Sequence, residues 1–193
     1  MDEMKETRRE LIDRTALRLF AERGFAEVSV RDIAAECGIG ESGLYRHMAS
    51  KEELAIRVFR EAYLGFAQEM VEAAPAEGGL HGALEAFVDV VLAGFDRDPV
   101  LMRFLLLRQH DTLAQAITLE DMTPLTVVRA CIVGAMDDGE IPVTDPDMAT
   151  AIVMGAVLQP MTFMLYGRIS APATSHREEI LSGASRAIGL KVT

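Results

Sequence analysis

An all-α fold is expected from three features of the sequence. Apolar residues recur every three to four positions over long stretches, and no long alternation of apolar and polar residues is present. Residues that cap helices, such as Ser, Thr and Asp, stand directly before these stretches. Half of the 193 residues are apolar but only 6% are aromatic. A chain of this length can bury a substantial core in one or two domains.

The helices can be placed from their end signals. The first is expected over residues 7–23, with Thr7 and Glu10 as its cap pair and Gly24 as its end. Two short helices follow within residues 29–47. The longer helices are expected over 51–73, 80–96, 99–109, 124–138, 146–169 and 176–188. Most of these begin with a recognisable cap, namely Ser50 with Glu53, Asp98-Pro99, Thr123-Pro124, Asp145-Pro146 and Ser175 with Glu178.

Residues 29–54 read SVRDIAAECGIGESGLYRHMASKEEL and carry the main functional signal. Ser29 and Asp32 form a capping box, and Gly38 supplies the left-handed residue that ends the first short helix. Gly40 is a weak cap for the second short helix. Two short helices joined by a glycine turn form a helix-turn-helix, which places its second helix, the recognition helix, in the major groove of DNA.

The polar side chains of this segment are the candidate DNA contacts. Arg31 and Arg46 can bind guanine edges, and Glu41 either accepts from a cytosine amino group or points away. The Tyr45 hydroxyl can bond a phosphate while its ring packs. Lys51 stands at a helix N-terminus, which suggests a phosphate partner, although an exposed lysine is the alternative. The full candidate set is Ser29, Arg31, Glu41, Ser42, Gly43, Tyr45, Arg46, His47 and Lys51.

Residues 7–55 resemble the DNA-binding domain of TetR-type (tetracycline-repressor-like) transcriptional regulators. The matching residues are Ala16, Phe20, Gly24, Phe25, Ser29, Val30, Ile33, Ala34, Gly38, Leu44, Tyr45, His47, Lys51, Glu52 and Leu54. Three positions depart from the family pattern: Gly40 replaces Ser or Thr, Gly43 replaces Thr, and Met48 replaces Phe. The resemblance implies a DNA-binding domain over residues 1–50 and a helical effector-binding and dimerisation domain over residues 51–193.

The charge distribution restricts how such a chain could bind DNA. The formal net charge is −11, but residues 1–51 contain nine Lys/Arg and ten Asp/Glu, so most of the acidic excess lies further along. The acidic second part would stay away from DNA. Binding must then depend on a local patch of Arg31, Arg46, His47 and Lys51, with a strong dependence on salt.

Residues 151–167, AIVMGAVLQPMTFMLYG, are apolar almost all round. One side of such a helix can pack on its own core, and the other side needs a partner. A transmembrane span is the less favoured alternative, because the run is short and contains Gln159-Pro160. A homodimer is expected, in which this helix and the one at 176–188 form a four-helix bundle. TetR-type regulators dimerise through their last two helices, and a dimer suits a palindromic operator in double-stranded DNA.

The second part of the chain also suggests a binding pocket. Residues 99–107 and 150–161 are more apolar than simple packing requires, and methionines suit adaptable apolar pockets. Ordinary core packing is the alternative. The candidate lining is Phe66, Phe87, Met102, Met154 and Gln159. Gln159 is expected to need a hydrogen-bond partner there. The resemblance favours a pocket over ordinary core packing, because similar proteins bind small effectors in this domain.

Other functions find less support in the sequence. His81, His110 and His176 have no second ligand at helical spacing, so no metal site is expected. His110-Asp111 lacks a nucleophile pattern, so an enzyme is not expected, and no cofactor is implied. Cys37 and Cys131 are interpreted as core thiols in a reducing compartment, and the charged N-terminus predicts a cytoplasmic protein.

The combined interpretation is a ligand-responsive transcriptional regulator, and the family resemblance favours a repressor. The rival interpretation is a helical small-molecule-binding protein that has lost specific DNA binding. Gly40, Gly43 and the acidic balance would allow this rival.

Overall fold

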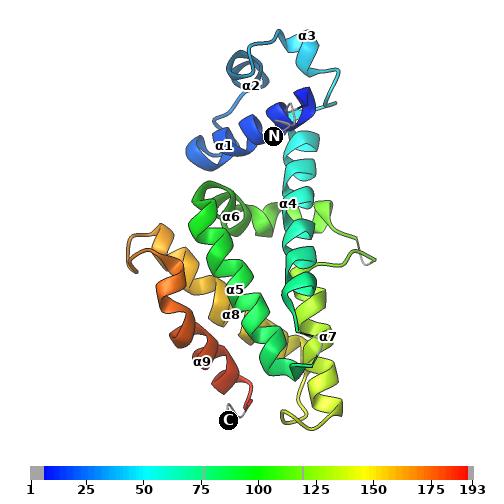
Figure 1. Cartoon of the computed structure of the whole chain (residues 1–193). Helices are drawn as coiled ribbons and strands as arrows, with labels where there is room; N and C mark the ends of the chain where they lie inside the picture. Colours follow the sequence, from blue (N-terminus) through cyan, green and yellow to red (C-terminus); the bar gives the residue numbers. More distant parts are fainter. Residues whose placement is uncertain (1–6, 76, 119, 191–193) are drawn as a thin grey trace, which may run out of the picture. The chain divides into compact units, whose positions relative to one another are not determined.

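A computed structural model describes residues 7–75, 77–118 and 120–190, with the side chains of residues 108–114 left out (Figure 1). The described chain is helical and contains no strand. Its elements are α1 Arg8–Arg23, α2 Val30–Glu36, α3 Glu41–Leu44, α4 Lys51–Ala73, α5 Gly79–Arg97, α6 Pro99–Ala116, α7 Pro124–Asp137, α8 Pro146–Leu165, the 3₁₀ helix η1 Ala173–His176, and α9 Arg177–Ala187. The expected all-α fold is confirmed.

The chain packs as two compact units. The first contains Met1–Ala62 and Val100–Leu119, and the second contains Tyr63–Pro99 and Glu120–Thr193. The packing units therefore do not divide at residue 50, because the first part of α4 and nearly all of α6 pack with the N-terminal helices. A functional division at residue 50 stays a prediction.

Most helix starts follow the expected local chemistry. Capping boxes are present at Thr7 with Glu10 and at Ser29 with Asp32. Thr123 and Asp145 cap α7 and α8, each with proline in the first turn. The Ser50 hydroxyl accepts from the Glu53 amide at 3.0 Å. These bonds join residues three positions apart or fewer, which is why they can be read from the sequence.

The predicted capping box at Ser175 is wrong. The Ser175 hydroxyl donates to the Pro172 carbonyl oxygen, and α9 begins two residues later at Arg177. The start of η1, which directly precedes α9, is held from a distance, because the Asp96 carboxylate accepts from the backbone amides of Ala173 and Thr174 at 2.7 and 3.0 Å. A long-range acceptor has replaced the local one. Two helix ends also differ from expectation, since α6 extends to Ala116 and α8 stops at Leu165.

Three aromatic rings connect the helices of the N-terminal unit. Phe104 of α6 stacks on Phe20 of α1 and meets Phe59 of α4 edge-on, with ring centroids 6.2 Å apart in both pairs. Phe25 packs back on Phe20 at 5.3 Å, as expected from the end of α1. All three of Phe20, Phe59 and Phe104 are buried. The helix-turn-helix is therefore supported by a rigid aromatic core.

Helix α8 has one buried and one exposed side. Val153, Val157 and Met161 are buried in the second unit. Large apolar side chains remain exposed on the other side, namely Met148, Ile152, Phe163 and Tyr166. By length and composition α8 is also the one helix of the described residues that could cross a membrane, which is weak support for a span when a single helix meets the test.

Candidate DNA-binding surface

The turn between α2 and α3 is built from backbone hydrogen bonds around Gly38. This residue has φ of +65°, a conformation that residues with a Cβ rarely adopt. The Gly38 amide donates to Ala35, and the Ile39 amide donates to Ala34, which closes α2. Gly40 then precedes α3 in an extended conformation without a side-chain cap. The expected role of the two glycines is confirmed.

The recognition helix is shorter than expected. Helix α3 covers Glu41–Leu44, and Tyr45, Arg46 and His47 continue as a turn in which the His47 amide donates to Leu44 at 2.8 Å. The missing cap hydroxyl at residue 40 and the glycine at residue 43 explain this, because glycine inside a helix costs about 1 kcal/mol relative to alanine. Two buried anchors, Leu44 and Met48, hold the segment in place.

The predicted DNA contacts are all exposed or half-buried. Ser29, Arg31, Glu41, Ser42, Tyr45 and Arg46 are exposed, whereas Gly43 and His47 are half-buried. The Ser29 hydroxyl is also used inside the protein, because it accepts from the Asp32 amide. Hydrogen bonds from Ser29 lower the pKa of Asp32, so the Asp32 carboxylate of this capping box is charged at neutral pH. Whether these residues touch DNA stays a prediction.

Lys51 is half-buried as well, and its ammonium group has partners inside the protein. Its ammonium donates to the carbonyl oxygens of Phe25 and Val28 at 2.9 and 2.8 Å, and lies 4.2 Å from the centroid of the Phe25 ring. These partners join the start of α4 to the segment between α1 and α2. The two internal carbonyls therefore explain why a lysine is accommodated at this helix N-terminus, and a contact between Lys51 and DNA stays a prediction.

A hollow of about 470 Å³ lies beside the recognition helix. Its lining is cationic and glycine-rich: Arg8, Ile39, Gly40, Ser42, Gly43, Arg46 and His47. A Cβ on Gly43 would make ordinary van der Waals contact with the Arg46 guanidinium, at 3.8 Å. Arg8, at the start of α1, is the residue that the sequence reasoning missed. No local pattern marks Arg8, because α1 and α3 are brought together only by folding.

The arginines of the N-terminal unit differ in whether a carboxylate engages them. Arg9, Arg18 and Arg57 are engaged by carboxylates in ion pairs of 3.7 Å or less. Arg8, Arg31 and Arg46 have no ion pair with any described residue. Arg23 and Arg103 of the same unit also have no ion pair with a described residue, but they lie outside the hollow. Guanidinium groups in this state are available to phosphates and base edges.

None of the five expected pocket residues lines the hollow beside the recognition helix or the apolar hollow of the second unit, so a pocket formed by them stays a prediction. Met102 is buried in the N-terminal unit, whereas Phe66, Phe87, Met154 and Gln159 belong to the second. Gln159 is exposed on α8, so it does not need a buried hydrogen-bond partner. Phe66 is used in packing, because a Cβ on Gly94 would lie 2.6 Å from its ring. Phe66 and Phe87 are both buried, and whether either contacts an effector stays a prediction.

The second unit has a different hollow, of about 130 Å³. Its lining is apolar apart from one thiol: Met70, Val71, Ala74, Leu80, Ala83, Leu84, Val127, Val128 and Cys131. Burial raises the pKa of Cys131, so its thiol is neutral at pH 7. The residues are contributed by α4, α5 and α7 and the ends beside them. No group of His, Cys, Asp or Glu in the described chain is arranged to hold a metal ion, and the side chain of His110 lies outside the described residues.

The sequence profile described as "Bacterial regulatory proteins, tetR family" matches residues 12–58, the segment that forms the helix-turn-helix and its supports. The chain has a TetR-family DNA-binding domain. A relative, the HTH-type transcriptional regulator YerO of Bacillus subtilis (strain 168), is 38% identical over 65 residues. That alignment covers 34% of this chain and 22% of YerO, so the chain spans about a fifth of this curated relative.

Solved structures resemble this chain over nearly its whole length. The transcriptional regulator FadR from Bacillus subtilis, in complex with stearoyl-CoA, has a TM-score of 0.80 and 19% identity, covering 90% of this chain and 96% of FadR. The fatty acid degradation regulator FadR from Bacillus halodurans has a TM-score of 0.78 at 15% identity, with coverages of 98% and 100%. A TetR-like transcriptional regulator from Rhodococcus sp. RHA1 has a TM-score of 0.75 at 18% identity, with coverages of 97% and 98%. These likenesses extend the shared fold beyond the DNA-binding domain to the helices that follow.

Proposed function

We propose that this chain is a ligand-responsive transcriptional regulator, a repressor that leaves a palindromic operator when a small apolar effector binds. The observation that carries the proposal is the set of unpaired cations around the recognition helix. Arg31 and Arg46 stand on the helix-turn-helix, and Arg8 enters the same hollow as Arg46. Because the unit as a whole is not basic, this patch must supply the attraction for phosphates.

The regulator is proposed to act in the cytoplasm as a homodimer. The support is the exposed apolar side of α8, which includes Ile152 and Phe163, in a protein whose other large apolar side chains are mostly buried. Exposed apolar surface of this kind commonly marks an interface. A two-fold dimer would carry two recognition helices to successive major grooves, so the operator would be an inverted repeat.

The proposed effector is a molecule with an apolar chain. The hollow between α4, α5 and α7 supports this, because its lining offers hydrocarbon and almost no hydrogen-bonding groups. A cavity of this size accepts a group about as large as benzene or a short alkyl end. The stearoyl-CoA bound by the Bacillus subtilis FadR has such an end. Saturated acyl chains are therefore the first effectors to test.

Helix α4 is the proposed route between the two functions. It carries Met70 and Val71 of the apolar hollow and also Lys51 and Arg57 of the N-terminal unit. An effector can lower DNA affinity only by its differential affinity for the DNA-binding and released states. A ligand that moved the later turns of α4 would bias these two states.

The test begins with selection of duplexes from a random-sequence pool by the purified protein. The expected result is enrichment of an inverted repeat, bound at least about a thousandfold more tightly than a shuffled duplex. Acyl chains of increasing length, as free acids and as CoA thioesters, are then added to the complex, and one length range should release it. If no sequence is enriched while acyl chains still bind, the chain is a small-molecule-binding protein without specific DNA recognition.

A further inference from the structure

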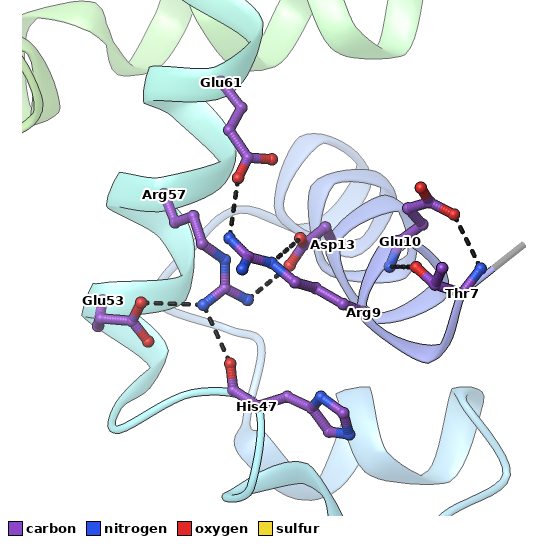
Figure 2. Close-up of polar contacts among 8 residues, drawn as sticks. All are labelled: Thr7, Arg9, Glu10, Asp13, His47, Glu53, Arg57 and Glu61. Atoms are coloured by element: carbon purple, nitrogen blue, oxygen red, sulfur yellow. Dashed lines mark hydrogen bonds and ion pairs between the residues drawn. The ribbon is translucent and has the colours of Figure 1, made fainter.

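Arg57 lies in the second turn of α4, where three elements of the N-terminal unit meet (Figure 2). Its side chain is only 14% exposed. The guanidinium Nη2 donates to Asp13 of α1 at 2.7 Å. Its Nη1 donates to Glu53 of α4 at 2.9 Å and to the backbone carbonyl oxygen of His47 at 3.0 Å. One planar group thus connects α1 and α4 to the segment that ends the recognition helix.

The charge on Arg57 is permanent. Burial lowers its pKa, but the hydrogen bond and charge of Asp13, with a contribution from Glu53, outweigh that effect and leave the pKa raised. A charged donor strengthens the bond to the His47 carbonyl, since hydrogen bonds from ions are about twice as strong as neutral ones. The His47 carbonyl is close to the last backbone bond of the recognition segment, where the His47 amide meets Leu44. A cation near the C-terminal end of a helix is stabilising, because that end carries a partial negative charge.

The geometry points to Arg57 as a positioning residue for DNA recognition. It holds the His47 backbone, and with it the adjoining Arg46, at a set place relative to α1 and α4. Direct contact with DNA does not explain the residue, because both of its terminal nitrogens already have internal partners. Its Nε is buried with no hydrogen-bond partner in the described chain. A buried donor without a partner costs free energy, and this cost is accepted where the side chain reaches His47.

The position demands arginine. The guanidinium presents donors in a planar fork that can reach separate acceptors at once, whereas a lysine ammonium is a compact point charge. Recognition by this short α3 also needs outside support, because its N-terminus has no side-chain cap. The inference rests on the proposed function for its biological meaning, but the positioning itself can be measured without DNA.

Arg9 offers a matched control in the same network (Figure 2). Its guanidinium also joins α1 to α4, since it pairs with Asp13 at 3.7 Å and with Glu61 at 3.1 Å. It has no bond to the recognition segment among the described residues. Its side chain is 57% exposed, so its replacement is also the milder change to the fold.

The first experiment compares Arg57→Gln, Arg57→Lys and Arg9→Gln by backbone NMR relaxation of the full chain. In the wild type the amides of Leu44 and His47 should have order parameters near about 0.85, typical of rigid backbone. Arg57→Gln should lower the His47 value to below about 0.6, which marks a flexible segment. The His47 order parameter of Arg57→Lys should lie between those of Arg57→Gln and the wild type. That of Arg9→Gln should equal the wild-type value. Thermal unfolding of each variant confirms that it is folded.

The second experiment measures affinity for the duplex selected by the wild type and for a shuffled duplex. Arg57→Gln should lose about tenfold in affinity for the selected duplex alone, the scale of one charged hydrogen bond. Its salt dependence should keep the wild-type slope, because no phosphate contact is removed. Rigid His47 amides in a folded Arg57→Gln variant would overturn the inference, as would a reduced salt slope. If the wild type selects no duplex, the proposed function fails while relaxation still decides the positioning role.

Discussion

The ammonium nitrogen of Lys51 lies 2.8 Å from the backbone carbonyl oxygen of Val28, and the same group reaches the Phe25 carbonyl at 2.9 Å. Val28 directly precedes Ser29, the cap of α2. The first residue of α4 therefore holds the chain at the entrance to the helix-turn-helix.

Replacing this lysine should destabilise the fold. Lys51→Met should lower the free energy of unfolding by about 2 kcal/mol, because two hydrogen bonds from a charged donor and the contact with the Phe25 ring are lost. Urea unfolding followed by circular dichroism measures this, with the exposed Arg31→Met as control, expected within about 0.5 kcal/mol of the wild type. Unchanged stability together with a weaker salt dependence of DNA binding would instead place Lys51 on a phosphate.

Arg8 should contribute one phosphate contact. Arg8→Ala is expected to weaken selected and shuffled duplexes alike, and to reduce the slope of log K against log salt by about 0.9. The control is Arg103→Ala, which removes an exposed arginine of α6 in the same unit but outside the hollow. Binding isotherms at several salt concentrations give both slopes. Equal slopes for Arg8→Ala and the wild type would remove Arg8 from the DNA-binding surface.

The exposed side of α8 should be a dimer interface. Ile152 and Phe163 are 41% and 44% exposed in the single chain. Ile152→Glu or Phe163→Glu would bury a charge on association, which should raise the dimer dissociation constant about a hundredfold. Val143→Glu is the control, because Val143 is 84% exposed between α7 and α8. Sedimentation velocity distinguishes the species, and wild-type behaviour of both α8 variants would refute this face as the interface.

The junction between α5 and η1 should make stability depend on pH. Burial raises the pKa of Asp96, but hydrogen bonds donated by Thr174 and Ala173 outweigh it and leave the pKa lowered. A carboxyl group with a lowered pKa in the folded state stabilises the protein above its unfolded pKa of about 3.9. This contribution is lost as pH falls through the folded-state pKa.

Thermal unfolding from pH 6 to pH 2 measures that contribution. Asp96→Asn should unfold at a lower temperature than the wild type at pH 6, and the difference should shrink as the wild-type carboxylate becomes protonated. The exposed Asp137, which has no hydrogen bond or ion pair from its carboxylate to a described residue, offers Asp137→Asn as a comparison. A difference between Asp96→Asn and the wild type that stayed constant with pH would show that the charge of Asp96 is unimportant.

Much of the fold could be foreseen because its determinants are local. Caps such as Thr7 with Glu10 and Ser29 with Asp32 join residues three positions apart, and the left-handed turn at Gly38 needs only one residue type. The helix periodicity of the remaining chain is equally local. The recognition surface was therefore foreseeable as a set of side chains on a helix-turn-helix.

The long-range partners were not foreseeable, and they assign the roles within the site. Lys51 reaches a carbonyl 23 residues away, and Arg57 reaches a carboxylate 44 residues away. The approach of Arg8 to the hollow and the exposure of Gln159 likewise depend on how whole helices pack. A long polar side chain can bond any acceptor within reach, and only the packed backbone decides which acceptors those are.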